Sequence, residues 1–378
     1  MHIKRRLLIT LIVLCICIAF GPAMYCSYGL PGGEPAADAA EGAEAGMDAS
    51  ALQSSFEYKK YADHSEYRKD LKWKMTSVHS AIAGYMDDDR TIPIPGLVRT
   101  YTSHDGIDSE SSSYIPQGLC KAGDYYLITA YDAEKINNSV IYVVDASSRQ
   151  VVSTLTLPNT FHAGGIAFDG KEIWLTGDTS DAYKGAPFVQ YIKYDVFLNM
   201  LNERLHEVKP SEMSGYVYIK NKPSFLECDG GRLWVGTYIG RKGTAEGYMN
   251  GYRITDGEDN GKLNTTLYAV ISGIDSSSQG ADIEGNYLYV SSSYKGSVSG
   301  LKTSFITKYE ISPLSQGMTA LYVKNREVTR VEVPKMNEEI LVEGGEIHIN
   351  FESAADAWKK PVIVTDRILA VRQSCWER

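Results

Sequence analysis

Apolar and polar residues alternate in short segments over most of this chain, and one such pattern recurs five times. In each copy, two runs of strand-forming residues flank a turn that contains glycine, which is typical of a β-hairpin. The five segments are QGLCKAGDYYLITAYD (117–132), GGIAFDGKEIWLTGD (164–178), SFLECDGGRLWVGTY (224–238), QGADIEGNYLYVSSSY (279–294) and EEILVEGGEIHINFES (338–353). Their turn glycines are Gly123, Gly170, Gly230, Gly285 and Gly344.

Two positions in these hairpins are apolar in every copy. The fourth residue before the turn glycine is Leu119, Ile166, Leu226, Ala281 or Ile340. The fifth residue after it is Ile128, Leu175, Val235, Val290 or Ile349. The residue just before this second set is large in every copy: Leu127, Trp174, Trp234, Tyr289 and His348. Adjacent residues of a strand point to opposite faces, so the second strand is predicted to be buried on both faces, between neighbouring sheets.

The spacing of the hairpins indicates a repeated sheet. Successive turn glycines are 47, 60, 55 and 59 residues apart, and further strand patterns follow each hairpin. Repeated four-stranded antiparallel sheets are the blades of a β-propeller. We therefore predict an all-β fold with a five-bladed propeller over residues 96–378, and six blades as the alternative if residues 197–222 hold a degenerate repeat. The last blade lacks one strand, which we expect residues 96–102 to supply, closing the ring.

The region before the propeller has a different pattern. Apolar residues recur at helical spacing within residues 55–95, which predicts one amphipathic helix that packs on its own domain. They are Leu71, Met75, Val78, Ile82 and Tyr85. Residues 24–54 are rich in Ala, Gly, Glu and Asp and are expected to form a flexible acidic linker.

The amino terminus has the layout of a secretory signal. Lys4, Arg5 and Arg6 precede an apolar run over residues 7–20, and small residues follow it. We predict a signal peptide over residues 1–23 and a secreted or cell-surface protein. An uncleaved signal anchor is the alternative, and it would be the only attachment to a membrane.

Charge and cysteine content limit the partners and the kind of scaffold that the chain can have. The formal net charge is −9, from 38 Lys and Arg against 47 Asp and Glu. Because an acidic surface repels phosphate, we expect no nucleic-acid partner. Four cysteines outside the signal are too few for a disulfide scaffold, and Cys120 and Cys228 are interpreted as buried thiols. We expect a monomer.

Several motifs resemble those of secreted bacterial propellers. SVIYVVDASSRQVVSTLTLP (139–158) resembles the repeat of YncE-like proteins. The resemblance to uncharacterised secreted propeller proteins of Gram-positive bacteria is carried by IPQGLC (115–120), HAGGIAFDGKEIWLTGD (162–178), PKMNEEI (334–340) and NFES (350–353). It spans roughly residues 114–372 and implies a propeller fold and export, without an established reaction. The chain departs from the group at Glu338-Glu339, where the group's pattern implies Glu-Gly.

The candidate ligand site follows from the propeller fold. Loops that precede the innermost strands line one mouth of the central channel, and the sixth residue before each turn glycine lies there. These residues are Gln117, Gly164, Ser224, Gln279 and Glu338, with His162 two residues before Gly164. Amide, hydroxyl, carboxylate and imidazole groups suit hydrogen bonding to a polar ligand, so Gln117, His162, Ser224, Gln279 and Glu338 are predicted to bind it. The alternative is that they satisfy strand ends and ordered water.

A second polar set lies eight residues after each turn glycine. It comprises Tyr131, Asp178, Tyr238, Ser293 and Glu352, which would form a rim, although Tyr and Asp are also ordinary turn residues. In addition, Glu227 and Asp282 share the third position before the glycine and would need partners if buried.

Two functions of different class fit these residues. The first is an extracellular binding or scaffold module for a polar small molecule, a glycan or a cell-surface protein. The alternative is a metal-assisted hydrolase or lyase acting on polysaccharide or lactone, with Glu338 and a second carboxylate from Asp282, Asp178 or Glu352 as acid and base.

Cofactor motifs are missing from the sequence. The seven histidines never pair at ligand spacing, and no Cys-x-x-Cys, P-loop or dinucleotide fingerprint occurs. We expect no cofactor and no metal ligands among these residues. A Ca²⁺ ion in the central channel, held by water and one carboxylate, is the alternative that stays open.

Overall fold

The computed structural model describes most of the chain after residue 79. The described residues are 80–97, 99–105, 107–177, 186–240, 245–257, 263–293, 303–358 and 364–377. All of them belong to one compact unit, Met47–Arg378. The predicted signal peptide, the linker and most of the helical segment lie outside the described residues.

Two four-stranded antiparallel sheets form the first half of the structure. The first blade consists of β4 (Tyr114–Ala122), β5 (Tyr125–Asp132), β6 (Val140–Asp145) and β7 (Val151–Thr156). The second consists of β8 (Ile166–Phe168), β9 (Glu172–Thr176), β10 (Phe188–Lys193) and β11 (Gly215–Tyr218). In both blades the predicted hairpin supplies the two inner strands.

Three further sheets complete the ring of blades. The third blade consists of β12 (Phe225–Asp229), β13 (Arg232–Gly236), β14 (Gly247–Asp256) and β15 (Leu263–Ile274), with β19 (Ala320–Tyr322) added parallel to β15. The fourth consists of β16 (Ser278–Glu284), β17 (Tyr287–Ser292), β18 (Thr303–Glu310) and β20 (Glu327–Pro334). The fifth consists of β21 (Asn337–Glu343), β22 (Glu346–Phe351), β23 (Arg367–Arg372) and β1 (Ile92–Pro93).

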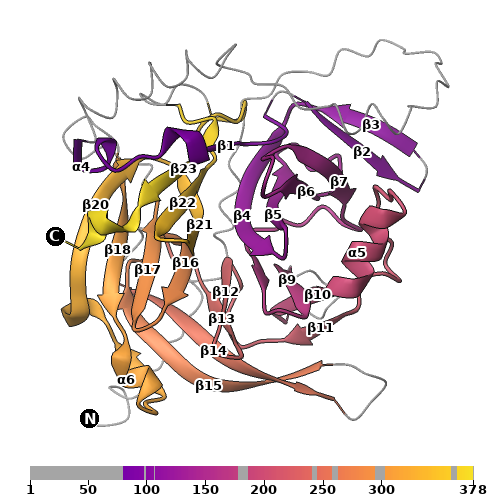
Figure 1. Ribbon diagram of the computed structural model, residues 1–378. Coiled ribbons are helices and arrows are strands. Elements are labelled where there is room, and N and C mark those ends of the chain that lie inside the picture. The colour runs from indigo at the N-terminus through magenta and orange to yellow at the C-terminus, as the bar shows by residue number, and fades with distance from the viewer. Residues whose placement is uncertain are drawn as a thin grey trace, which may run out of the picture. The chain divides into compact units, whose positions relative to one another are not determined.

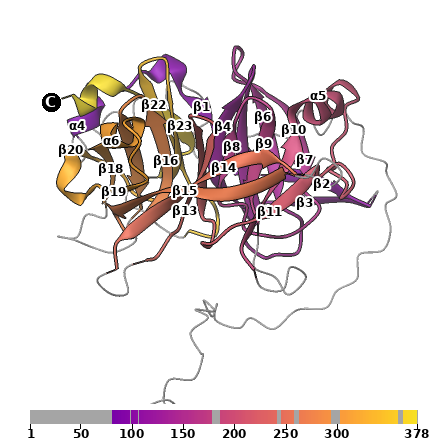
Figure 2. The same ribbon diagram turned by 90° about the horizontal axis from the view of Figure 1, so that it is seen from below.

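The five sheets form a closed ring. Their innermost strands contact one another in the order β4, β8, β12, β16, β21 and back to β4. Figure 1 shows the five sheets arranged around this centre. Figure 2 shows the same sheets from below, where the long β14–β15 hairpin crosses the view. Apolar side chains such as Trp174 and Trp234 are fully buried between sheets, as the repeated columns predicted. The prediction of a five-bladed β-propeller is confirmed.

Residues 197–222 do not form a sixth blade. They contain most of helix α5 (Tyr194–Asn202) and then strand β11, which completes the second blade. The helical pattern arises because Phe197 and Met200 point into the core between the first two blades. The six-blade alternative is therefore wrong.

Ring closure uses an earlier strand than the one predicted. Strand β1, Ile92–Pro93, pairs with β23, with Ile92 opposite Ile368. The predicted closing segment, residues 96–102, instead leads into strand β2 (Thr100–His104), which pairs with β3 (Ile107–Ser111) in a separate hairpin. The physical reason is burial, because Ile92 and Ile94 fill the core beside the fifth blade. Pro93 is tolerated in β1 because β1 is an edge strand.

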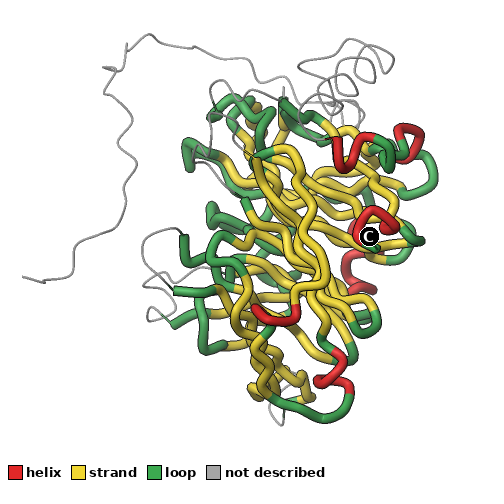
Figure 3. The backbone as a smooth tube through the Cα atoms, turned by 90° about the vertical axis from the view of Figure 1, so that its left-hand side faces the viewer, coloured by secondary structure: helices red, strands yellow, loops and turns green. Residues whose placement is uncertain are grey.

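Helices are short and lie at the edges of the described structure (Figure 3). Besides α5 they are α4 (Ser80–Ala83), α6 (Ser312–Ser315), η1 (Asp88–Arg90), η3 (Lys324–Arg326) and η4 (Gln373–Trp376). Helix α4 is the described end of the predicted amphipathic helix, and it contacts β20 with Ile82 buried. Within the described residues, no helix has the length and apolar character needed to cross a membrane.

Three cysteines lie in the described part, and all three are free thiols. Cys120 and Cys375 are buried, whereas Cys228 is half-buried. Cys120 and Cys228 are therefore not joined to each other in this structure.

Candidate functional site

A β-bulge interrupts the inner hairpin of three blades at the same position. In the first blade, Pro116 pairs with Ala130 and Leu119 with Ile128, so Gln117 and Gly118 together face one residue, Thr129. The equivalent pairs in the fourth and fifth blades are Gln279-Gly280 and Glu338-Glu339. Bulges redirect a side chain out of the regular alternation and are common beside binding sites. Three of the predicted ligand-binding residues thus lie at bulges.

Two of these bulge residues meet across the boundary between the fourth and fifth blades. The Gln279 side-chain amide Nε2 donates to both carboxylate oxygens of Glu338, at 3.1 and 3.0 Å. Glu338 is only 2% exposed, whereas Gln279 is half-buried. The amide therefore holds the Glu338 carboxylate in place and still has an oxygen that accepts hydrogen bonds.

An aromatic pair lies near these two residues. The rings of Tyr131 and His162 stack with their centroids 4.3 Å apart and an interplanar angle of 29°. Burial raises the pKa of Tyr131 above its usual value, and the nearby carboxylates of Glu352 and Glu338 raise it further. Tyr131 is therefore within electrostatic range of both carboxylates. His162 is exposed, so one ring of the pair faces solvent.

We call Tyr131, His162, Gln279, Glu338 and Glu352 the mouth site. It consists of the stacked pair, the hydrogen-bonded pair and a second carboxylate within electrostatic range of Tyr131. It combines three residues predicted to bind ligand with two from the predicted rim. The first, fourth and fifth blades contribute to it, together with the loop between the first and second blades.

The other two predicted ligand-binding residues serve the backbone in this structure. Gln117 is buried, and its amide donates to the carbonyl of Pro116 at 2.8 Å. The Ser224 hydroxyl accepts the N–H of Tyr238 at 3.0 Å. Gly164 packs between Ser224 and His162. A Cβ at this position would collide with the Ser224 carbonyl and would lie 3.1 Å from His162 Nδ1. Ligand binding by Gln117 and Ser224 stays a prediction, and Asp178 lies outside the described residues.

Three carboxyl groups lie deeper, on the inner strands of the third, fourth and fifth blades. We call Glu227, Asp282 and Glu339 the axial carboxyls. Burial raises the pKa of all three, and that of Asp282 reaches about 7. Glu227 keeps some accessible surface, yet the protein around it and the nearby Asp282 and Glu339 raise its pKa strongly. Burial thus favours the protonated form of these three carboxyls.

Two axial carboxyls bind the backbone of the neighbouring blade. Glu339 Oε1, on the fifth blade, accepts the N–H of Ala281 on the fourth at 2.8 Å. Asp282 Oδ2, on the fourth blade, accepts the N–H of Val342 on the fifth at 2.7 Å. The Val342 N–H thus gives the buried Asp282 carboxyl a hydrogen-bond partner, which a buried carboxyl requires whether it is charged or protonated. It also joins the same two blades that Gln279 and Glu338 join at the mouth.

No metal site emerges from the described part of the chain. There, no group of three or more His, Cys, Asp or Glu side chains has an arrangement that could hold a metal ion. Glu339 and Asp282 accept hydrogen bonds from backbone N–H groups. A channel Ca²⁺ held by water and one carboxylate stays a prediction.

Sequence reasoning missed a set of buried polar residues, three of which bond to the next blade or the segment before it. The sixth residue after the turn glycine is polar in four copies: Thr129, Thr176, Ser291 and Asn350. Thr129 donates to the carbonyl of Ala163, and Asn350 to the carbonyl of Gln117, at 2.7 and 2.8 Å. Polar residues directly after an apolar column in successive copies were the signal that could have revealed them.

Comparisons with known proteins add little to these findings. No protein-family model and no curated protein matches the chain. Among solved structures, it is similar to a Thermus thermophilus protein described as a putative oxidoreductase (glucose dehydrogenase), at 13% identity and a TM-score of 0.38, covering 73% of this chain and 91% of that one. It is also similar to Hsv2p of Kluyveromyces lactis, at 10% identity and a TM-score of 0.31, covering 65% of this chain and 67% of that one.

A third similar structure is the computationally designed Ika8 protein, at 9% identity and a TM-score of 0.26, covering 64% of this chain and 69% of that one. These low scores carry no functional argument, and the five-bladed fold is established by the sheet topology. The resemblance to YncE-like proteins stays a prediction.

Proposed function

We propose that this protein is an exported binding module that recognises a glycan at the mouth site. The observation that carries the proposal is the stacked Tyr131–His162 pair next to the bonded Gln279–Glu338 pair. The propeller fold is consistent with a binding or scaffold role. The sequence pattern of residues 1–23 supports export.

The mouth site offers the two kinds of contact that a sugar needs. An exposed aromatic ring packs against the C–H face of a sugar ring, and His162 presents such a ring with Tyr131 behind it. The Gln279 amide oxygen accepts hydrogen bonds from hydroxyl groups, while its amide nitrogen stays bonded to the buried Glu338 carboxylate. Because Gln279 already orients Glu338, little side-chain freedom is lost on binding.

The test is binding of the full chain to a glycan panel, followed by titration calorimetry on the glycans that bind. His162→Ala and Gln279→Ala should each weaken binding about tenfold or more, since each removes one stacking or hydrogen-bonding partner. Gln316→Ala, on an exposed residue at the end of α6, is the matched control and should leave affinity unchanged.

Two results would overturn the proposal. The first is a panel with no glycan bound by the wild-type protein. The second is equal affinity in His162→Ala, Gln279→Ala and the Gln316→Ala control, which would show that any glycan binds elsewhere on the propeller.

The hydrolase or lyase alternative has one observation in its favour. Burial raises the pKa of Asp282 to about 7, which is where a general acid works well. The discriminating test is turnover on a panel of polysaccharides and lactones. Glycan binding without turnover supports the binding module, whereas turnover lost in a folded Glu338→Gln variant supports the enzyme.

A further inference from the structure

The mouth site holds two carboxyl groups at the same end of neighbouring strands in the fifth blade. Glu338 lies in the bulge of β21, and Glu352 follows β22, with its N–H bonded to the Met336 carbonyl at 3.0 Å. Both are almost fully buried, with exposed fractions of 2% and 3%. Arg367, the buried arginine of the same blade, has Asp366 as a partner at 3.8 Å. Since water and salt screen buried charges less than exposed ones, both carboxylates act on the mouth of the ring.

The fifth blade brings these carboxyl groups to the aromatic pair of the mouth site. The Asn350 amide, two residues before Glu352, donates to the Gln117 carbonyl at 2.8 Å. Gln117 lies on β4, the strand that pairs with the strand of Tyr131. The two carboxylates of the mouth site raise the pKa of Tyr131 beyond the effect of its burial. The stacked aromatic pair therefore lies in a negative potential.

The Gln279 amide presents a hydrogen-bond acceptor to a ligand. A carboxylate only accepts hydrogen bonds, so the amide turns its Nε2 donor toward Glu338, at 3.1 and 3.0 Å from the two oxygens. This leaves the amide oxygen of the half-buried Gln279 for a ligand. A ligand group at this position must therefore donate hydrogen bonds. An ammonium group donates three and carries a positive charge, whereas an acetamido group donates one and is neutral.

The exposed ring of the aromatic pair is positioned by a buried backbone segment. Ala163, directly after His162, is 1% exposed and has φ 47°, a left-handed conformation that is unfavourable for a residue with a Cβ. The Ala163 carbonyl accepts the Thr129 hydroxyl at 2.7 Å, which ties this segment to the first blade. Backbone strain of this kind is common at binding sites. The His162 ring is thus placed on Tyr131 by fixed backbone and is ready to pack against a sugar ring.

We propose that the mouth site selects glycans whose sugar rings carry a free amino group, such as hexosamines without their acetyl groups. This inference rests on the proposed glycan function and specifies its ligand. The sugar ring packs on His162, and its ammonium group donates to the Gln279 amide oxygen. The buried Glu338 and Glu352 carboxylates attract the ammonium group through space.

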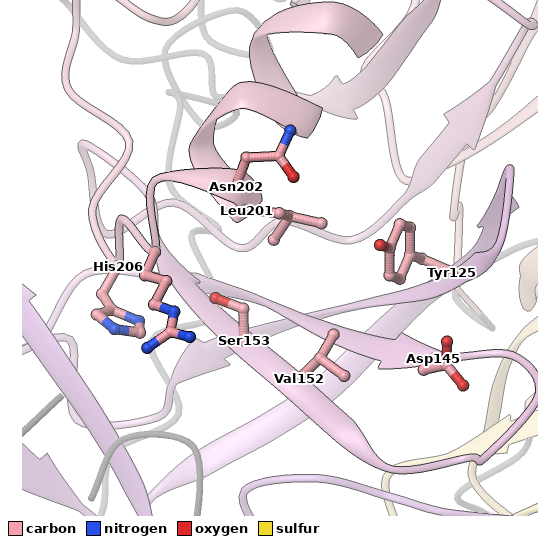
Figure 4. Close-up of a pocket in the computed structure, with 8 residues that line it drawn as sticks. Tyr125, Asp145, Val152, Ser153, Leu201, Asn202 and His206 are labelled. Atoms are coloured by element: carbon pink, nitrogen blue, oxygen red, sulfur yellow. The ribbon is translucent and has the colours of Figure 1, made fainter. Parts of the chain in front are cut away.

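A carboxylate elsewhere on the propeller provides a matched control. A pocket of about 240 Å³ lies between the first blade and the end of helix α5, and Asp145 lines it (Figure 4). The Ser147 hydroxyl and the N–H and hydroxyl of Ser148 donate to Asp145 and lower its pKa to about 2, so this carboxylate stays charged. Asp145 belongs neither to the mouth site nor to the axial carboxyls. An amine attracted by any available carboxylate would bind here as well.

The test compares three trisaccharides that differ in one substituent on each ring. Titration calorimetry on the full chain near pH 7 uses tri-glucosamine, its fully N-acetylated form and cellotriose, which carry amino, acetamido and hydroxyl groups at this position. Tri-glucosamine should bind about tenfold or more tightly than the other two, since it alone makes a charge-assisted contact. Added salt should reduce this preference, because ions screen the attraction between the ammonium group and the carboxylates.

Two variants that change a carboxylate to an amide locate the source of the preference. Glu352→Gln keeps the size of the side chain and removes its charge, so the preference for the amino form should fall to about threefold or less. Asp145→Asn keeps an oxygen for Ser147 and Ser148 and should retain the full preference. Thermal unfolding shows whether both variants are folded. The salt dependence of the wild-type protein tests the same attraction without any substitution.

Four results would overturn the proposal. Equal binding of the three trisaccharides, or no binding of any of them while another glycan of the panel binds, would exclude selection of the amino group and leave the glycan function standing. A preference that does not fall with salt would exclude attraction by the carboxylates. A preference lost in Asp145→Asn and kept in Glu352→Gln would place the amine in the pocket beside α5. Tri-lysine that binds as tightly as tri-glucosamine would show that charge alone is recognised.

Discussion

Glu339 occupies a place that glycine fills in three other blades. The fifth residue before the turn glycine is Gly118, Gly165 or Gly280 in the first, second and fourth blades, where the adjacent inner strand leaves no room for a Cβ. A Cβ on Gly280 would collide with Glu339 itself. The Glu339 side chain thus uses the space above Gly280, and its carboxyl reaches the Ala281 N–H.

Replacing Glu339 should destabilise the protein most when the substitution removes the oxygen that accepts the Ala281 N–H. Glu339→Ala leaves the Ala281 N–H buried without a partner, which costs about 1–3 kcal/mol. Glu339→Gln keeps an oxygen at the same place and should cost clearly less. Urea unfolding followed by tyrosine and tryptophan fluorescence measures both variants.

The exposed residue Glu203 supplies the control, and Glu203→Gln should leave the unfolding free energy unchanged. Equal losses in Glu339→Ala and Glu339→Gln would contradict the acceptor role. They would indicate instead that the shape or ionisation of the carboxyl itself matters.

The sequence predicted part of the mouth site residue by residue. Counting from the turn glycines identified Gln279 and Glu338, which lie at the same position in their repeats and meet in the structure, and it identified His162 two residues before Gly164. It did not reveal the bulges, since an extra residue opposite Asn350 or Ser291 depends on the partner strand. It also did not reveal that the Gln117 amide donates to the Pro116 carbonyl, because that hydrogen bond depends on local backbone geometry.

At the scale of elements, the closing strand shows where a periodicity argument fails. Strand β1 contains only Ile92 and Pro93, which is too short for any alternation to be recognised. Residues 100–104 have a longer strand pattern, and they do form a strand, but it pairs with β3. Which strand closes the ring depends on long-range packing, and Ile92 and Ile94 determine it by filling the core beside β23.

Truncation of these two isoleucines should weaken the closed ring. Ile92 and Ile94 are fully buried, so Ile92→Ala and Ile94→Ala should each lower the free energy of unfolding by about 2–5 kcal/mol. Ile107, on β3, is 73% exposed, and Ile107→Ala is the matched control, with an effect of about 0.5 kcal/mol or less. Guanidinium unfolding curves measure all three. Losses in the first two variants no larger than in the control would show that β1 does not contribute to closure.

At the scale of the whole molecule, the axial carboxyls concentrate acidic groups where three blades meet. Glu227, Asp282 and Glu339 are close enough to one another to affect one another's ionisation, and Asp229 and Glu284 add to the negative potential. Cys120, from the first blade, is also close, and its thiol pKa is raised by burial and then by Glu227 and Glu339. Because burial raises the pKa of all three axial carboxyls, protonation reduces the repulsion among them.

This arrangement predicts that the contribution of Asp282 to stability falls as the pH rises from about 4 to about 7. The pKa of Asp282 is raised from 3.8 to about 7, so over this range the folded protein keeps a proton that the unfolded chain has released. The stabilisation is complete below the unfolded pKa and is lost as the pH passes the folded pKa. A shift of about 3 units corresponds to at most about 4 kcal/mol. Asp132 and His348 contribute in the opposite direction, because the pKa of Asp132 is lowered and burial lowers that of His348 to about 4.

Asp282→Asn tests this prediction directly, because asparagine stays neutral and still offers an oxygen to the Val342 N–H. Near pH 4 the variant and the wild type should have similar free energies of unfolding. Near pH 8 the variant should be more stable, since its folded state does not require a buried charge. Urea unfolding across this pH range, with Glu203→Gln as the exposed control, measures the difference. A variant that is less stable than the wild type by the same amount at every pH would show that Asp282 acts through its hydrogen bond alone, and that the charge at the centre of the ring has no influence on stability.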